Sequence, residues 1–153
     1  MGRRRRGREA ALKLLYAFDI TQEPVTDILA APWVQVMIPE MIRDFTVALV
    51  TGVDAHRAEI DALVQEWSLH WSLERIGVIE RNILRFAIYE LIYMDDIPPN
   101  VTINEAVEVA KRYGTEEAPS FVNGILDRIK HEVDTRVGEG PAALSGVSAC
   151  PPA

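Results

Sequence analysis

The 153-residue sequence has a single cysteine, no long apolar run and no catalytic or metal-ligand pattern. The lone cysteine, Cys150, cannot form an internal disulfide and is typical of a reducing compartment such as the cytoplasm. No apolar run approaches the roughly 20 residues that span a bilayer, so no membrane partner is expected. The histidines His56, His70 and His131 lack metal-site spacing, and no strand precedes the glycines of 137–153. We therefore expect a binding protein, not an enzyme.

Positive charge is concentrated at the N-terminus, and the rest of the chain has a net negative charge. The formal net charge is -7, yet five of the first eight residues are arginine: Arg3, Arg4, Arg5, Arg6 and Arg8. Such a block is typical of an arm that binds nucleic acid, because the guanidinium fork matches phosphate. A secretory signal is not favoured, since Glu9 and Lys13 interrupt the apolar stretch that follows. A solvated arginine stub without a partner is the alternative.

The apolar residues recur with helical spacing and predict an all-α fold, a compact bundle of about six to seven helices. The first helix is expected over 8–19. Another begins at Pro39 and keeps its period to Trp67, with Gly52 marking a close helix contact or a bend. Segment 25–38 is expected to be a loop or short helix, because no partner strand occurs elsewhere.

Polar residues indicate where the later helices begin. Ser72 is expected to cap a helix that extends through Leu91, and Ser120 to begin the last one. Between them, Thr102 and Glu105 have the spacing of a capping box, in which each side chain bonds the other residue's backbone N–H.

Three stretches together resemble one protein family. They are RRRRGREAALKLLYAFD near the start, GVIERNILRFAIYEL at 77–91 and VTINEAVEVAKRYGTEEAPSFVNGILD at 101–127. Over roughly residues 3–135 the chain resembles the NusB family of bacterial transcription antitermination factors. The resemblance implies two packed three-helix bundles, no enzymatic activity and no cofactor.

The resemblance also implies partners. The protein would pair with NusE, a small-subunit ribosomal protein, and bind boxA RNA in ribosomal RNA leader transcripts. It would reach RNA polymerase indirectly, with other Nus factors, and suppress premature termination in the cytoplasm. A homodimer is left open by the sequence.

Carried onto this sequence, the family's RNA-binding set is Arg4, Arg5, Arg6, Arg8, Phe121, Asn123 and Asp127. The arginines would contact phosphates. Phe121 would stack on an unpaired base or, alternatively, serve as a core residue. Asn123 would bond a base edge, and Asp127 would accept from a base amino group or act as an ordinary surface or capping carboxylate.

The NusE-facing set is Tyr16, Glu80, Glu105 and Glu108. Tyr16 shares the first helix with the arginines. Glu80 would pair with a basic residue of NusE or, alternatively, be an ordinary helix carboxylate. Glu105 and Glu108 are weaker members, because Glu105 already has the expected capping role.

The expected organisation is a basic arm at 1–8, a helical domain at 9–136 and a disordered tail at 137–153 rich in Gly, Pro, Ala and Ser. Two other functions fit the same sequence. One is a non-enzymatic protein-assembly module whose arginines stay solvated. The other is an accessory domain related to those of ribosomal RNA methyltransferases, which the short chain after the helices disfavours.

Overall fold

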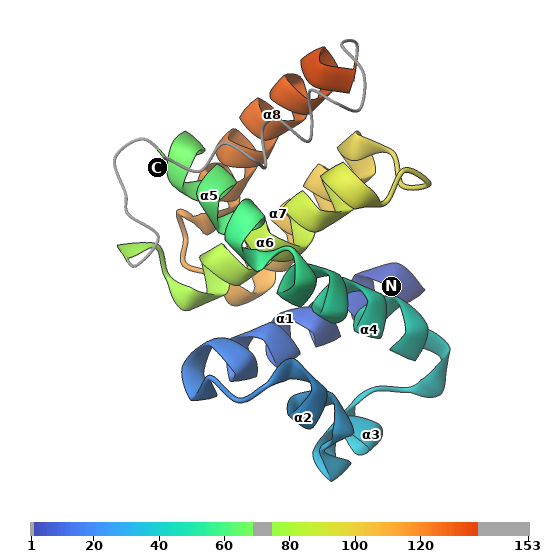
Figure 1. The fold of residues 1–153 in the computed structure, drawn as a ribbon. Helices are drawn as coiled ribbons and strands as arrows, with labels where there is room; N and C mark the ends of the chain where they lie inside the picture. The colour runs from blue at the N-terminus through green and yellow to red at the C-terminus, as the bar shows by residue number, and fades with distance from the viewer. Residues whose placement is uncertain (1, 69–74, 138–153) are drawn as a thin grey trace.

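A computed structural model describes residues 2–68 and 75–137, with side chains described as far as Val133. These residues form eight helices and no strand (Figure 1). The helices are α1 (Arg3–Thr21), α2 (Val25–Ala30), α3 (Pro32–Met37), α4 (Glu40–Ala55), α5 (Arg57–Trp67), α6 (Val78–Tyr93), α7 (Pro99–Tyr113) and α8 (Ala118–Val137). The predicted all-α class is confirmed, and segment 25–38 forms the short helices α2 and α3.

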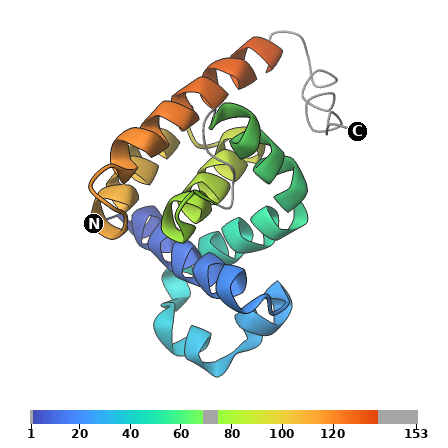
Figure 2. The same ribbon diagram turned by 90° about the vertical axis from the view of Figure 1, so that its left-hand side faces the viewer.

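The helices pack in two groups. Helices α1 to α4 contact one another and occupy the lower part of Figure 1, and α5 to α8 form the second group above them. Helix α6 joins the groups, because it packs against α1 and α4 on one side and against α5, α7 and α8 on the other. Helix α8 runs along the outside of the second group (Figure 2). The two-part helical fold that the resemblance implied is thus present.

A continuous apolar core lies where α1 and α6 meet. Helix α1 contributes the buried Ala11, Leu14 and Leu15, and α6 contributes the fully buried Ile83 and Phe86. Burying one such aliphatic or aromatic side chain stabilises a fold by about 1.5–3 kcal/mol. This core fixes α1 along most of its length, so side chains at both of its ends are held at defined positions.

The prediction of one long helix from Pro39 to Trp67 is wrong, because the helix is interrupted at His56. His56 has φ -116° and ψ 21°, ends α4 and precedes α5, and its ring stacks on Tyr93 with centroids 4.1 Å apart. The close helix contact predicted at Gly52 is confirmed, because a Cβ there would collide with the ring of Tyr89 on α6.

The capping box predicted at Thr102 and Glu105 is also wrong. Helix α7 already begins at Pro99, whose fixed φ suits the first helical position. Thr102 therefore lies inside the helix, where its hydroxyl donates to Oε1 of Glu90 at 3.0 Å. Likewise α8 begins at Ala118 rather than at Ser120.

The arginine-rich segment is part of the folded body. Helix α1 is continuous from Arg3 across residues 8 and 9, where the sequence predicts that a basic arm meets the helical domain. The predicted cap Ser72 lies outside the described residues. The same is true of the predicted tail 137–153, apart from Val137 at the end of α8.

Candidate nucleic-acid interface and partner surface

Two of the five N-terminal arginines present free guanidinium groups. Arg3 and Arg6 are exposed, and neither side chain has a hydrogen bond or ion pair with any described residue. Arg4 is also exposed and lies 3.2 Å from the exposed carboxylate of Asp96. An exposed pair of this kind contributes little stability and exchanges readily with another anion. This turn of α1 is therefore available to a polyanion.

Arg5 is held more firmly by α7. Its Nε and Nη2 donate to the two carboxylate oxygens of Glu105 at 2.9 and 2.6 Å, a bidentate pair in which Arg5 is one third exposed. The hydrogen bond from Arg5 is the main reason that the pKa of Glu105 lies below its usual range. The same bond raises the pKa of Arg5.

Arg8 is buried, which corrects its prediction as a phosphate ligand. It is only 1% exposed, and its Nε and Nη2 donate to Glu90 of α6 at 2.8 and 2.7 Å. Glu90 is itself fully buried and also accepts from Thr102. A buried guanidinium needs such a carboxylate to offset its desolvation. Arg8 therefore joins α1 to α6 and α7 inside the fold, and its guanidinium group is not accessible at the surface.

The residues predicted on α8 lie across α7 from the arginines. Helix α7 packs against both α1 and α8. Helix α8 runs antiparallel to α7, since Ala118 adjoins Gly114 and Lys130 bonds Asn100 at 3.0 Å. The arginine end of α1 and the Asp127–Lys130 turn therefore both flank the first half of α7.

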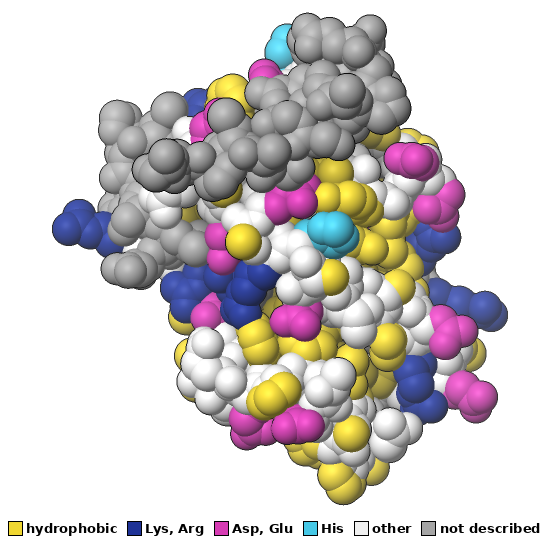
Figure 3. All heavy atoms as spheres, viewed as in Figure 1, with side chains coloured by type: hydrophobic (Ala, Val, Ile, Leu, Met, Phe, Trp, Pro, Cys, Tyr) yellow, Lys and Arg dark blue, Asp and Glu magenta, His cyan; other side chains and the backbone are white. Residues whose placement is uncertain are grey.

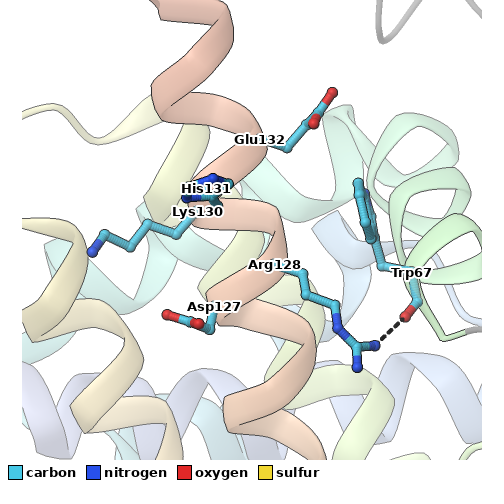
Figure 4. A pocket seen from close by; sticks show the side chains of 6 residues that line it. All are labelled: Trp67, Asp127, Arg128, Lys130, His131 and Glu132. Carbon is cyan, nitrogen blue, oxygen red and sulfur yellow. Dashed lines mark hydrogen bonds between the residues drawn. The ribbon is translucent and has the colours of Figure 1, made fainter.

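Within α8, Asn123 and Asp127 are exposed, whereas Phe121 is partly buried and packs against the core. The packing of Phe121 thus agrees with the alternative prediction, in which it is a core residue, although part of its side chain stays exposed. Figure 4 shows Asp127 and Lys130 projecting from one side of α8, and Arg128 reaching from the other side toward the carbonyl of Trp67. The RNA contacts of this helix stay a prediction.

Tyr16 and Glu80, predicted to face a protein partner, lie together in a shallow depression. The rest of its lining comes from the start of α6 and the end of α7, including Gly77, Tyr113 and Thr115. Tyr16 is 43% exposed and carries its ring toward solvent from the middle of α1. A half-exposed aromatic ring beside a carboxylate is suited to a protein contact with a basic side chain.

Glu105 and Glu108 do not share this depression. Glu105 is bound to Arg5, and Glu108 pairs with Lys111 at 3.2 Å on the same helix. The depression is therefore lined by two of the four predicted partner residues, and the role of Glu105 and Glu108 stays a prediction.

The sequence analysis did not predict a buried polar network near the C-terminal end of α1. Asp19 accepts from Arg81 at 2.7 Å and from Asn82 and Arg85 at 3.0 Å, and Arg85 also binds Asp61 of α5. Burial alone would raise the pKa of Asp19, but the bonds from Arg81 and Asn82 and the charge of Arg85 lower it. The available signal was three polar residues, Arg81, Asn82 and Arg85, on a helix whose neighbouring positions Ile83, Leu84 and Phe86 are apolar.

One face of the molecule carries charged side chains of both signs. On the face in Figure 3, basic side chains stand at isolated points or in a small cluster bordered by acidic ones. Among residues 2–68 and 75–137, no group of three or more His, Cys, Asp or Glu side chains is placed to hold a metal ion. No helix in this part of the chain combines the length and apolar character needed to cross a bilayer.

Comparison with protein families gives a match over most of the chain. The model of the NusB family matches residues 5–131. A protein of Desulforapulum autotrophicum named transcription antitermination protein NusB is 45% identical over 132 residues, covering 85% of this chain and 92% of that protein. The protein of the same name from Geobacter sulfurreducens is 47% identical over 135 residues, covering 84% and 94%.

Solved structures give the same match in three dimensions. T. maritima NusB superposes with a TM-score of 0.76 at 38% identity, covering 86% of this chain and 92% of that one. A crystal structure of antitermination factors NusB and NusE in complex with double-stranded RNA contains a chain with a TM-score of 0.75 at 29% identity, covering 86% and 98%. Sequence and fold therefore agree.

Proposed function

The chain belongs to the NusB family, and we propose that it is an RNA-binding transcription antitermination factor that acts together with NusE. It binds boxA RNA in ribosomal RNA leader transcripts and joins other Nus factors on RNA polymerase, where it suppresses premature termination. It acts in the cytoplasm by binding rather than by catalysis, and it uses no cofactor.

The observation that carries this proposal is the similarity to a chain solved with NusE and double-stranded RNA, which covers 86% of this protein. The charge distribution supports it. The exposed Arg3, Arg4 and Arg6 stand on the first turns of α1, and the remaining sequence is strongly acidic. RNA is therefore attracted to this end and repelled elsewhere.

NusE binding is assigned to the depression around Tyr16 and Glu80. The Glu80 carboxylate offers a partner for a basic side chain, and the exposed Tyr16 ring offers apolar area with a polar tip. Arg6 and Tyr16 lie about 15 Å apart along one helix, given 1.5 Å per residue. RNA and NusE can thus be held side by side, and RNA that contacts both proteins gains affinity through effective concentration.

The test is binding of a labelled boxA-like RNA with and without NusE over a salt series. NusE is expected to tighten binding. Arg6→Ala is expected to weaken it and to reduce the salt slope by roughly one, because one phosphate contact is lost. Arg75→Ala removes an equal charge from an exposed residue that belongs to neither predicted set and should leave the slope unchanged. Absence of RNA binding even with NusE would favour a protein-assembly module.

A further inference from the structure

The five N-terminal arginines differ in how tightly carboxylates hold them. Arg3 and Arg6 have no acidic partner among the described residues, and Arg4 has only the exposed Asp96. Arg8 lies at the other extreme, buried on Glu90. Arg5 is intermediate: it is bound through two hydrogen bonds, yet one third of its side chain is exposed beside the free arginines.

The carboxylate of Glu105 lies between the guanidinium groups of Arg5 and Arg8. Its two oxygens accept from Arg5, and its Oε1 also lies 3.7 Å from Nη1 of Arg8. Because Arg8 is already neutralised by Glu90, Arg5 is the cation that Glu105 chiefly satisfies. The bidentate arrangement is the one that guanidinium also adopts with two oxygens of a phosphate.

We propose that Glu105 occupies, in the free protein, the position that an RNA phosphate takes at Arg5 in the complex. This inference rests on the RNA-binding function proposed above. RNA first meets the free Arg3 and Arg6, and a neighbouring phosphate then displaces the carboxylate from Arg5. RNA binding at Arg5 is therefore an exchange, in which a phosphate replaces the Glu105 carboxylate, and not the occupation of a vacant site.

The exchange discriminates between ligands. An isolated anion must displace a carboxylate that is covalently held at high effective concentration, so it gains little at Arg5. An RNA already held at the neighbouring arginines presents its phosphate at a comparable effective concentration. Glu105 therefore lowers affinity for stray anions more than for an RNA that engages several arginines together.

The test compares Glu105→Gln with Glu108→Gln in binding to boxA-like RNA with NusE present. Both variants remove one negative charge from α7, but Glu108 pairs with Lys111 and not with an N-terminal arginine. Glu105→Gln is expected to tighten RNA binding roughly two- to five-fold beyond Glu108→Gln, the range that partly exposed ion pairs support. In an Arg5→Ala background this difference should disappear.

Equal effects of the two variants would overturn the exchange, since only long-range charge would then be at work. Weaker binding by Glu105→Gln would also overturn it and make Glu105 a positioning residue for Arg5. If Glu105→Gln folds poorly, the wild-type protein supplies the readout: the NMR signals of the Arg5 Nε–H and the Glu105 carboxyl carbon should both shift on adding RNA. An unmoved Glu105 signal with bound RNA refutes the exchange alone, whereas a wild type that binds no RNA with NusE refutes the proposed function as well.

Discussion

The two ends of α1 carry ion pairs of opposite character. At the N-terminal end the helix supplies cations in excess, and only part of them meet carboxylates from α6, α7 and their connection. At the C-terminal end it supplies one carboxylate, Asp19, which accepts from three side chains of α6. The first arrangement leaves positive charge for a ligand. In the second arrangement the carboxylate of Asp19 is fully paired within the fold, so its ion pairs serve only to hold α1 against α6. We call these two arrangements the open and the closed end of α1.

Arg8 tests where the boundary between the two kinds of pair lies. Arg8→Ala leaves Glu90 buried without its cation, and we expect a loss of about 3–5 kcal/mol in the free energy of unfolding. Urea unfolding followed by circular dichroism measures it. Arg6→Ala, at the exposed surface, should change stability by no more than about 0.5 kcal/mol. If Arg8→Ala were as stable as the wild type but deficient in RNA binding, Arg8 would belong with the open pairs.

Asp19 tests the closed end. Asp19→Asn keeps the shape of the side chain but removes its charge from three donors, and we expect a loss of about 1.5–3 kcal/mol. Asp96→Asn breaks the exposed pair with Arg4 and should cost at most about 1 kcal/mol. A loss for Asp96→Asn as large as that for Asp19→Asn would erase the distinction between the two ends.

The Asp19 network also predicts a pH dependence. The folded-state pKa of Asp19 is lowered, so its contribution is fully present above the unfolded pKa of roughly 3.9 and is lost as pH falls through the folded value. The stability difference between wild type and Asp19→Asn should therefore shrink when unfolding is measured in increasingly acidic buffer. A difference that stays constant into acid would show that the carboxylate charge is not what stabilises the network.

Periodicity predicted most of the helices because their buried stripes are long and regular. It failed at His56 because Val53 and Ile60, both buried, are seven residues apart, which keeps the stripe in phase across the break. The same periodicity could have predicted that Arg8 is buried. Arg8 lies three, four and seven residues before Ala11, Leu12 and Leu15, so it continues their buried face by one turn.

The capping box failed for a different reason. Thr102 and Glu105 have the right spacing, but their side chains bond Glu90 and Arg5, which are distant in sequence. Local spacing cannot reveal such partners, and the same limit applies to the Asp19 network. By contrast, Tyr16 and Glu80 were paired through the family resemblance, and the structure brings them into one depression.

Glu80 provides the smallest expected effect on stability and the sharpest test of the partner surface. It is partly exposed in the first turn of α6, where the helix dipole favours a carboxylate by only about 0.3–1 kcal/mol. Glu80→Lys should therefore shift the thermal midpoint little, while charge reversal strongly weakens NusE capture in a pull-down or titration. Glu40→Lys is the matched control, because Glu40 is an exposed carboxylate in the first turn of α4 and belongs to neither predicted set, and it should leave capture intact. A large fall in the thermal midpoint would instead show that Glu80 is needed for the fold, and it would leave the depression around Tyr16 without evidence of a NusE contact.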